Sequence, residues 1–312
     1  MIKRLALTLV LFLAVITVLA GCSAKPPEKV GLKIGSLPRL IDLIAYVAQQ
    51  EGLFEKQGVT VEIVPFRSTV EMNTTLLAGE LDGIIQDLFE AVNMNRDKET
   101  VKIVGRNVMP DMFHILVPSG SNISSPAQLK GTEIAVATGT IIEYGLDELL
   151  KSAGMDSKDV TKVNVPSMPL RLEILNQGKV PAAIFTQPLT DLAVLSGARV
   201  ILDDSKQPFV GPGLIFSTGA LKNKSEAIRR CVQAWQQAVD LVNARPDKYQ
   251  SLFIDVARVP EPLTKRLTVP AFPKLRLPTE AEVTPVVKWM ADKGLINKPL
   301  RLQDIVDTSF LK

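Results

Sequence analysis

Three features of this sequence could bind a small polar molecule: arginine side chains, an aspartate, and a short loop of small residues. Arg39 and Arg67 each stand shortly before a helical pattern, and a guanidinium group can hold a carboxylate or sulfonate through two parallel hydrogen bonds. As arginines of surface loops, both could equally be solvated. Asp87 stands at the end of the buried strand pattern 81–87, so we expect a partly desolvated carboxylate that needs a partner. That partner could be a ligand N–H, an arginine such as Arg106, or a helix N-terminus.

The third feature is a short loop of small residues, Thr138, Gly139 and Thr140, in front of another helical pattern. Such a loop lets a ligand approach exposed N–H groups and the positive end of a helix dipole, which favours an anionic or carbonyl group. A second interpretation stays open. Thr140 and Ser68 are each followed three residues later by glutamate, so both hydroxyls could serve only as helix caps.

The elements that must position these residues occur twice. Strand patterns at 33–37, 59–66 and 81–87 alternate with helical patterns at 40–52 and 69–80. The same order returns in strands 133–137, 160–167 and 180–187 and in helices 141–154 and 169–178. Pro65 aligns with Pro166, Leu76 with Leu175 and Gly79 with Gly178. Strand, helix, strand, helix, strand in one sheet requires parallel pairing with helical crossovers.

The fold class predicted is therefore α/β, with two doubly wound lobes joined by a two-segment hinge. We expect residues 30–115 and 214–312 to form lobe 1 and residues 116–213 to form lobe 2. The two crossovers make the hinge. Helical patterns at 225–245 and 279–294 follow the second crossover, and we expect them to pack on lobe 1.

In open parallel sheets, ligands bind outside the carboxyl ends of the strands. Six loops then face one cleft between the lobes. The ligand-binding residues predicted from these loops are Arg39, Asp42, Arg67, Ser68, Thr69, Asp87, Thr138, Gly139, Thr140, Met168, Thr186, Gln187 and Pro188.

Composition argues against several other kinds of site. The single histidine, His114, disfavours most metal sites and catalytic triads, so no metal, cofactor or catalytic residue is predicted. We expect His114 to be structural, Trp235 and Trp289 to pack the core or the lobes, and Cys231 to be a buried, inert thiol. There are 36 basic residues, two of which leave with the export signal described next, and 33 acidic ones. A net charge of +1 does not favour nucleic acid.

The N-terminus predicts export. Lys3 and Arg4 precede an uncharged run, 5–20, which is too short for a typical transmembrane helix. The quartet ending at Cys22 resembles a bacterial lipobox, which implies a signal peptide at 1–21 and a lipid on Cys22. An ordinary cleaved signal is the alternative. Residues 22–29 read as a solvated tether. The chain would be extracytoplasmic and anchored to the cell membrane, or on its periplasmic face if there are two membranes.

Several segments carry a family likeness: KIGSLP, VAQQEGLFEKQGVTVEIVPF, LLAGELDGII, SSPAQLKGTEIAVATGT and ILNQGKVPAAIFTQP. They resemble substrate-binding lipoproteins of ABC importers, in the type 2 periplasmic-binding-protein-like branch that handles nitrate, sulfonates, taurine and thiamine-pyrimidine precursors. The resemblance implies a monomer that closes two lobes over one small molecule, a sulfonate- or nitrate-like anion or a small heterocycle. By the same resemblance, the binding protein then delivers the molecule to a membrane permease that works with an ATPase. One position departs from the family pattern, which usually has an acidic residue there. The first copy has Asp82 at this position, whereas the second copy has Pro181.

Two other functions stay open at this point. One is an enzyme on the same bilobal fold, of the pyrimidine-synthesis or menaquinone-pathway type, with Asp87, Glu143 or His114 as the acid or base. The other is a sensory receptor that binds a solute and presents its closed form to a signalling partner.

Overall fold

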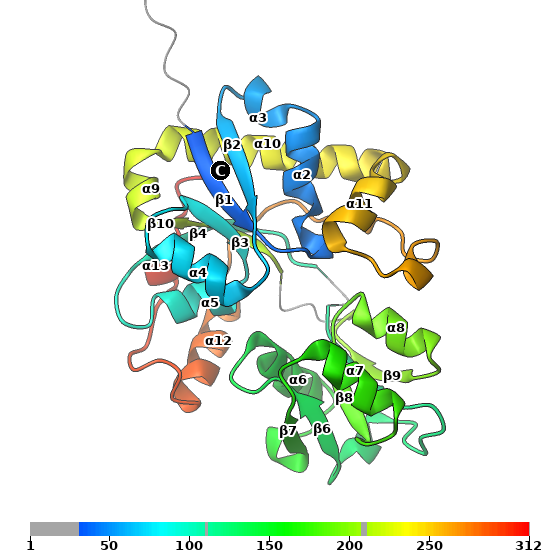
Figure 1. Ribbon diagram of the computed structural model, residues 1–312. Coiled ribbons are helices and arrows are strands. Elements are labelled where there is room, and N and C mark those ends of the chain that lie inside the picture. The colour runs from blue at the N-terminus through cyan, green and yellow to red at the C-terminus, as the bar shows by residue number, and fades with distance from the viewer. Residues whose placement is uncertain (1–30, 110–111, 207–210, 312) are drawn as a thin grey trace, which may run out of the picture. The chain divides into compact units, whose positions relative to one another are not determined.

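The structure is a computed structural model, and it describes residues 31–109, 112–206 and 211–311 (Figure 1). The predicted signal peptide, lipidated Cys22 and tether therefore lie outside the described residues.

The first lobe contains a five-stranded sheet in the order β2-β1-β3-β10-β4. Its strands are β1 (Gly31–Ser36), β2 (Thr60–Pro65), β3 (Gly83–Gln86), β4 (Val101–Arg106) and β10 (Gly213–Ser217). β1 pairs in parallel with β2 and β3, whereas β10 runs antiparallel to β3 and β4. The parallel part is the arrangement that the repeated pattern predicts.

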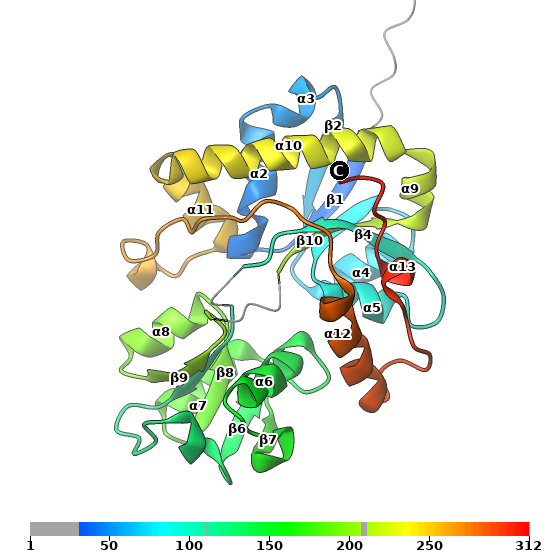
Figure 2. The ribbon, with the colours of Figure 1, turned by 180° about the vertical axis from the view of Figure 1, so that it is seen from behind.

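Helices cover both faces of this sheet. They are α2 (Leu43–Gln50), α3 (Leu53–Lys56), α4 (Thr69–Leu77), α5 (Leu88–Met94), α9 (Thr218–Asn223), α10 (Ser225–Ala244), α11 (Gln250–Ala257), α12 (Glu280–Asp292) and α13 (Leu302–Ile305). Figure 2 shows α10 crossing the sheet beside α2. Ile84 and Ile85 are neighbours in β3 yet belong to different core clusters, one with α4, α5 and α12 and the other with α2 and α10. Successive side chains of a strand point to opposite faces, so both faces are buried.

The second lobe repeats this plan in the order β7-β6-β8-β5-β9. Its strands are β5 (His114–Val117), β6 (Glu133–Val136), β7 (Thr161–Asn164), β8 (Ala182–Phe185) and β9 (Arg199–Asp203), and its helices are α6 (Ile141–Ser152), α7 (Met168–Asn176) and α8 (Leu189–Leu195). β6 pairs in parallel with β7 and β8, and β5 is antiparallel to β8 and β9. Short 3-10 turns complete the two lobes, at Leu40–Asp42, Pro126–Leu129, Ser157–Asp159, Pro246–Tyr249 and Glu261–Leu263.

The two copies end their second helices in the same way. Gly79 follows α4 with φ +82° and Gly178 follows α7 with φ +66°. A left-handed residue after a helix favours glycine, because it has no Cβ to clash. The predicted pairing of these glycines therefore has a common geometric cause.

The crossovers differ in detail from the predicted boundaries. The expected division after residue 115 runs through β5, which lies wholly in the second sheet, so the first crossover ends before His114. β10 is in the first sheet and begins at Gly213, one residue before the expected return. Each crossover thus leads into an antiparallel strand inserted beside the parallel unit of the other lobe.

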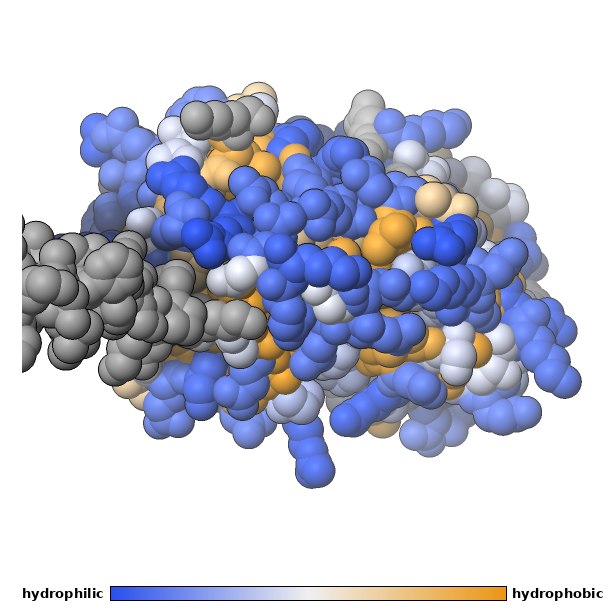
Figure 3. Space-filling model, turned by 90° about the horizontal axis from the view of Figure 1, so that it is seen from above, coloured by the Kyte–Doolittle hydropathy of each residue, from blue (hydrophilic) through white to orange (hydrophobic). Residues whose placement is uncertain are grey.

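Across the described part of the chain, no helix combines the length and apolarity needed to span a bilayer. Figure 3 shows one face of the molecule, on which hydrophilic side chains predominate and hydrophobic ones form small separate areas.

Candidate functional site

A cavity of about 250 Å³ lies where the carboxyl ends of strands from both lobes meet. The first lobe contributes residues of the loops after β1 and β3 and of α4 and α5, and the second contributes residues around α6, α7 and β8. The described residues that line it are Leu37, Arg39, Ile41, Thr69, Gln86, Asp87, Glu90, Met112, Phe113, Ile141, Ile142, Met168, Thr186, Gly211 and Pro212. The position is the one expected for a ligand site in paired open sheets.

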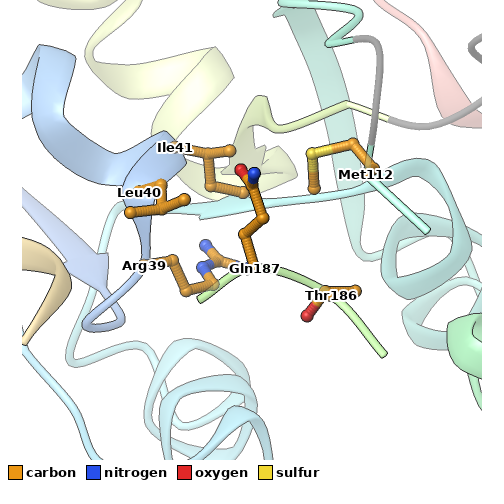
Figure 4. A pocket seen from close by; sticks show the side chains of 6 residues that line it. All are labelled: Arg39, Leu40, Ile41, Met112, Thr186 and Gln187. Atoms are coloured by element: carbon orange, nitrogen blue, oxygen red, sulfur yellow. The ribbon is translucent and has the colours of Figure 1, made fainter. Parts of the chain in front are cut away.

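Two further cavities adjoin this one through shared lining residues. A small one of about 80 Å³ is lined by Arg39, Leu40, Ile41, Met112, Thr186 and Gln187 (Figure 4). A larger one of about 390 Å³ shares Leu40, Ile41, Met112 and Gln187 with it and extends to Phe253 and Phe272. In Figure 4 the Gln187 side chain projects toward Ile41 and Met112.

The structure brings six of the predicted residues to these cavities. Arg39, Thr69, Asp87, Met168 and Thr186 line the 250 Å³ cavity, and Gln187 lines the two adjoining ones. Pro188 follows Gln187 through a cis peptide bond at the start of α8 and is absent from the described linings.

Asp42 lies behind Arg39 and holds it. Its carboxylate is fully buried and accepts hydrogen bonds from Arg39 Nε at 2.8 Å and Nη2 at 3.3 Å. The same guanidinium donates to Gln86 Oε1 at 3.1 Å and to the carbonyl of Ile85 at 2.7 Å. Burial raises the pKa of Asp42, while Arg39 lowers it. Arg39 is therefore only partly exposed, and protein groups already occupy most of its donors.

Two carboxylates of α5 line the cavity. Asp87 is the N-cap of α5 and accepts from the N–H of Glu90 at 3.1 Å, so the helix N-terminus is its partner. Glu90 Oε2 accepts from Asn73 Nδ2 at 2.8 Å. Burial raises the pKa of Asp87, and burial followed by the charge of Asp87 raises the pKa of Glu90. Both shifts show that negative charge is costly here in the protein alone.

Gln86 links these groups. It is 2% exposed, accepts from Arg39 and donates to Thr69 Oγ1 at 3.2 Å. Gln86 is the last residue of β3 and is not among the ligand-binding residues predicted from the sequence. Its orientation is set from both sides, which stiffens the floor of the cavity.

The remaining predicted residues lie elsewhere. Arg67 and Ser68 are exposed, and Ser68 caps α4 by accepting from Glu71 N at 3.2 Å. Thr138 N donates to Asn164 Oδ1 at 3.1 Å, Gly139 N donates to Glu143 Oε2 at 2.7 Å, and Thr140 caps α6. None of these five residues belongs to the described cavity linings. The N–H groups of Thr138 and Gly139 already donate to protein acceptors. The hydroxyls of Ser68 and Thr140 act as helix caps, as in the second interpretation of the sequence.

Sequence reasoning also missed lining residues from the crossovers, Met112, Phe113, Gly211 and Pro212. A signal for them exists in hindsight, since a segment that runs between two lobes must pass the cleft. It missed Ile141 and Ile142 because they read as the apolar face of a helix.

Other residues that were singled out are structural. His114 is buried beside Thr190, at 3.2 Å between Nδ1 and Oγ1. Trp235 is in the core and donates to Asn107 Oδ1 at 3.1 Å. Cys231 is fully buried, and burial raises the pKa of its thiol to about 12. A thiol with that pKa is unreactive at neutral pH.

Outside the cavity, α6 of one lobe contacts α12 of the other. Trp289 Nε1 donates to Asp147 Oδ2 at 2.8 Å, and its ring meets that of Tyr144 edge-on at 5.7 Å. Lys293 pairs with Glu143. Although burial opposes it, hydrogen bonds from Lys293, Gly139 N and Lys162 hold the pKa of Glu143 below its usual value. Trp289 therefore packs between the lobes, as the sequence predicts.

The NMT1/THI5-like family model matches residues 43–249, so the chain belongs to the NMT1/THI5-like family. The match spans elements of both lobes.

Two relatives cover most of the chain. An ABC transporter periplasmic binding protein, by its given name, of Brachyspira hyodysenteriae is 28% identical over 77% of this chain and 75% of its own. A protein of Bacillus subtilis that is named for binding aliphatic sulfonates is 23% identical over 97% of this chain and 95% of its own. The periplasmic aliphatic sulphonate binding protein SsuA of Escherichia coli superposes with a TM-score of 0.77 at 19% identity, covering 91% and 94% of the two chains. This structural likeness confirms the periplasmic-binding-protein fold.

Proposed function

We propose that the chain is the extracytoplasmic solute-binding component of an ABC importer, and that it holds a small molecule between its lobes for delivery to a permease and its ATPase. The observation that carries this is one cavity lined by side chains of both lobes at the strand ends. Only the closed arrangement gives a ligand contacts from both lobes at once, so binding favours closure. The two relatives support the assignment by their names.

Binding without chemical change is part of the proposal. Within the described lining of the 250 Å³ cavity there is no Ser, Cys, His or Lys. The acidic candidate of the enzyme alternative, Asp87, is used as a helix cap, and Glu143 is paired with Lys162 and Lys293 outside the cavity. These contacts favour a receptor over an enzyme, in which an acid or base must reach the reacting atom.

The test combines binding with a search for turnover. The full chain, purified in detergent, is screened by thermal shift against sulfonates, nitrate, taurine, carboxylates, amines and pyrimidines. A ligand at 100 times its dissociation constant adds about 2.7 kcal/mol of stability. Each hit is then incubated with the protein and recovered. We expect at least one stabilising ligand to be recovered unchanged, whereas conversion of a hit into a product would refute the proposal.

Attachment through a lipid on Cys22 is the second part of the proposal, supported by the lipobox-like segment before that residue. Cells that express the chain are labelled with a radioactive or alkyne fatty acid. We expect label in the wild type and none in Cys22→Ser, which should leave the membrane fraction. Equal labelling of both would remove the anchor from the account.

A further inference from the structure

We infer that the cavity takes a small organic cation, an amine or amidinium group with an apolar body, in preference to a sulfonate or other anion. This inference rests on the proposed solute-binding function and narrows it. Its basis is the charge that lines the cavity and the use already made of each charged group.

The positive charge in the lining of the 250 Å³ cavity is already balanced. Arg39 is the cationic side chain in the described lining, and it is paired at 2.8 Å with Asp42, a carboxylate with no exposed surface. Its Nη groups also donate to Gln86 and to the carbonyl of Ile85. An anion that recruited Arg39 would have to compete with a desolvated carboxylate and with two acceptors fixed in the core. Arg67, the other candidate clamp, is exposed and outside the described linings.

The negative charge of the lining is not balanced. Asp87 is the N-cap of α5 and Glu90 lies three residues further on, in its first turn. Both residues line the cavity. The charge of Arg39, which is bound to Asp42, acts on both carboxylates, and that of Arg106, which pairs with Glu282, acts on Asp87. Among the described residues, Asp87 accepts from backbone N–H groups at the start of α5 and Glu90 accepts from the neutral amides of Asn73 and Asn93, so neither carboxylate has a cationic hydrogen-bond partner. With all groups ionised, Arg39, Asp42, Asp87 and Glu90 carry two net negative charges, and the neighbouring cluster of Arg106, Arg276 and Glu282 carries one net positive charge, so the region remains negative by one.

An amine or amidinium would supply the missing partner. Its N–H groups would donate to the carboxylate oxygens, and its charge would offset the burial and the repulsion from Asp87 that raise the pKa of Glu90. Hydrogen bonds between charged groups are the strong ones. A sulfonate would instead meet two carboxylates of like charge.

The rest of the lining suits an apolar body. Ile41, Met112, Phe113, Ile141 and Met168 contribute aliphatic, aromatic and thioether surface from both lobes. Met side chains adapt to irregular shapes. A ligand with a positive end and a compact ring or chain matches both parts of the cavity.

The experiment uses probes of one shape and opposite charge. The full chain in detergent is titrated with benzamidine and with benzenesulfonate by calorimetry, in low-salt buffer at pH 7.5. We expect benzamidine to bind and benzenesulfonate to bind at least about tenfold more weakly. Equal binding of the two probes, or tighter binding of benzenesulfonate, would overturn the inference. So would the absence of benzamidine binding at about 10 mM, a concentration on the order of the weakest dissociation constant that such a charge pair supports.

Two isosteric variants assign the effect to the carboxylates. Asp87→Asn keeps a good N-cap residue, and Glu90→Gln keeps an acceptor for Asn73. Each should weaken benzamidine about 10- to 100-fold, as loss of a charged hydrogen bond does. Glu71→Gln changes an exposed glutamate of α4 by the same unit of charge and should leave binding within about twofold.

The outcomes separate the inference from the function on which it rests. If sulfonates bind tightly and unchanged and the two variants have no effect, the solute-binding function stands and the cationic ligand class falls. If every probe that binds is converted to a product, the function itself falls.

Discussion

Asp42 shows how one buried carboxylate can organise a binding loop. It holds Arg39 and also accepts from Ser36 Oγ at 3.0 Å and from Leu37 N at 3.2 Å. We predict that Asp42→Asn lowers the free energy of unfolding by about 2–4 kcal/mol, because the arginine and the loop N–H lose a charged acceptor. Urea denaturation measures the change. Arg67→Ala, at an exposed position, should stay within about 0.5 kcal/mol, and equal effects of the two would contradict the role of Asp42.

Asp87 illustrates a carboxylate whose burial costs stability. Its pKa is raised in the folded protein, so the folded state holds the proton more tightly than the unfolded chain does. The stabilisation linked to this proton is present below the unfolded pKa and is lost as pH rises through the folded pKa.

The corresponding prediction concerns Asp87→Asn, which caps α5 without a charge. We expect this variant to unfold at a higher urea concentration than the wild type, and the increase should be larger at pH 7, where the wild-type carboxylate is ionised, than at pH 4. Unfolding curves at both pH values measure the difference, with Glu71→Gln as the control. A gain of the same size at both pH values would show that the Asp87 carboxylate is not destabilised by burial.

Single residues also mark what the sequence could not provide. Arg39 and Arg67 look alike as arginines of loops that follow strands, yet one lies against Asp42 and the cavity while the other is exposed. The difference comes from β3, which brings Gln86 and the carbonyl of Ile85 to Arg39. No local pattern contains that contact, because the partners are more than 40 residues apart.

Among the elements, α12 is fixed to the first sheet by a charged cluster. Glu282 completes the capping box of α12 with Thr279 and pairs with Arg106 and Arg276. Arg106 is 1% exposed. We predict that Glu282→Gln lowers the free energy of unfolding by about 3 kcal/mol, since it leaves a buried guanidinium without its carboxylate. Glu280→Gln, exposed on the same first turn, is the control, and a loss below about 1 kcal/mol for Glu282→Gln would contradict the argument.

The same cluster predicts a dependence on pH of the opposite sign to that of Asp87. Burial opposes ionisation of Glu282, but its hydrogen bonds from Arg276 and Thr279 and the charge of Arg106 lower its pKa to about 2. The stabilisation is therefore present above the unfolded pKa and is lost as pH falls through about 2. The loss of unfolding free energy caused by Glu282→Gln should become smaller from pH 6 to pH 2 in urea titrations. A loss of the same size at both pH values would exclude the charge of Glu282 as its cause.

Elements of the two repeats were predictable because alternation and helical spacing are local properties. β1, β2 and β3 and their counterparts β6, β7 and β8 pair in parallel as the pattern requires. The direction of β5 and β10 was not predictable in this way. Each follows a crossover, and its antiparallel place depends on where the other lobe leaves a free strand edge.

For the whole molecule, the contact between α6 and α12 couples the lobes at a distance from the cavity lining. Trp289 lies between Phe89 of its own lobe, at 5.9 Å between ring centroids, and Tyr144 and Asp147 of the other. The arrangement that makes this contact is also the one in which both lobes line one cavity. Any interaction that favours it should raise ligand affinity by up to its own free energy.

We therefore predict that Trp289→Ala weakens benzamidine binding about 5- to 10-fold, although Trp289 does not line the described cavities. Small-angle scattering should show a larger radius of gyration for the variant, because the lobes separate more often. Lys288→Ala is the matched control, since Lys288 is exposed on the same helix and pairs only with Asp292 among the described residues. Unchanged affinity and radius in Trp289→Ala would mean that the hinge segments, rather than the α6–α12 contact, set the distance between the lobes. The coupling would then have to be sought near β5 and β10, where the two crossovers enter their sheets.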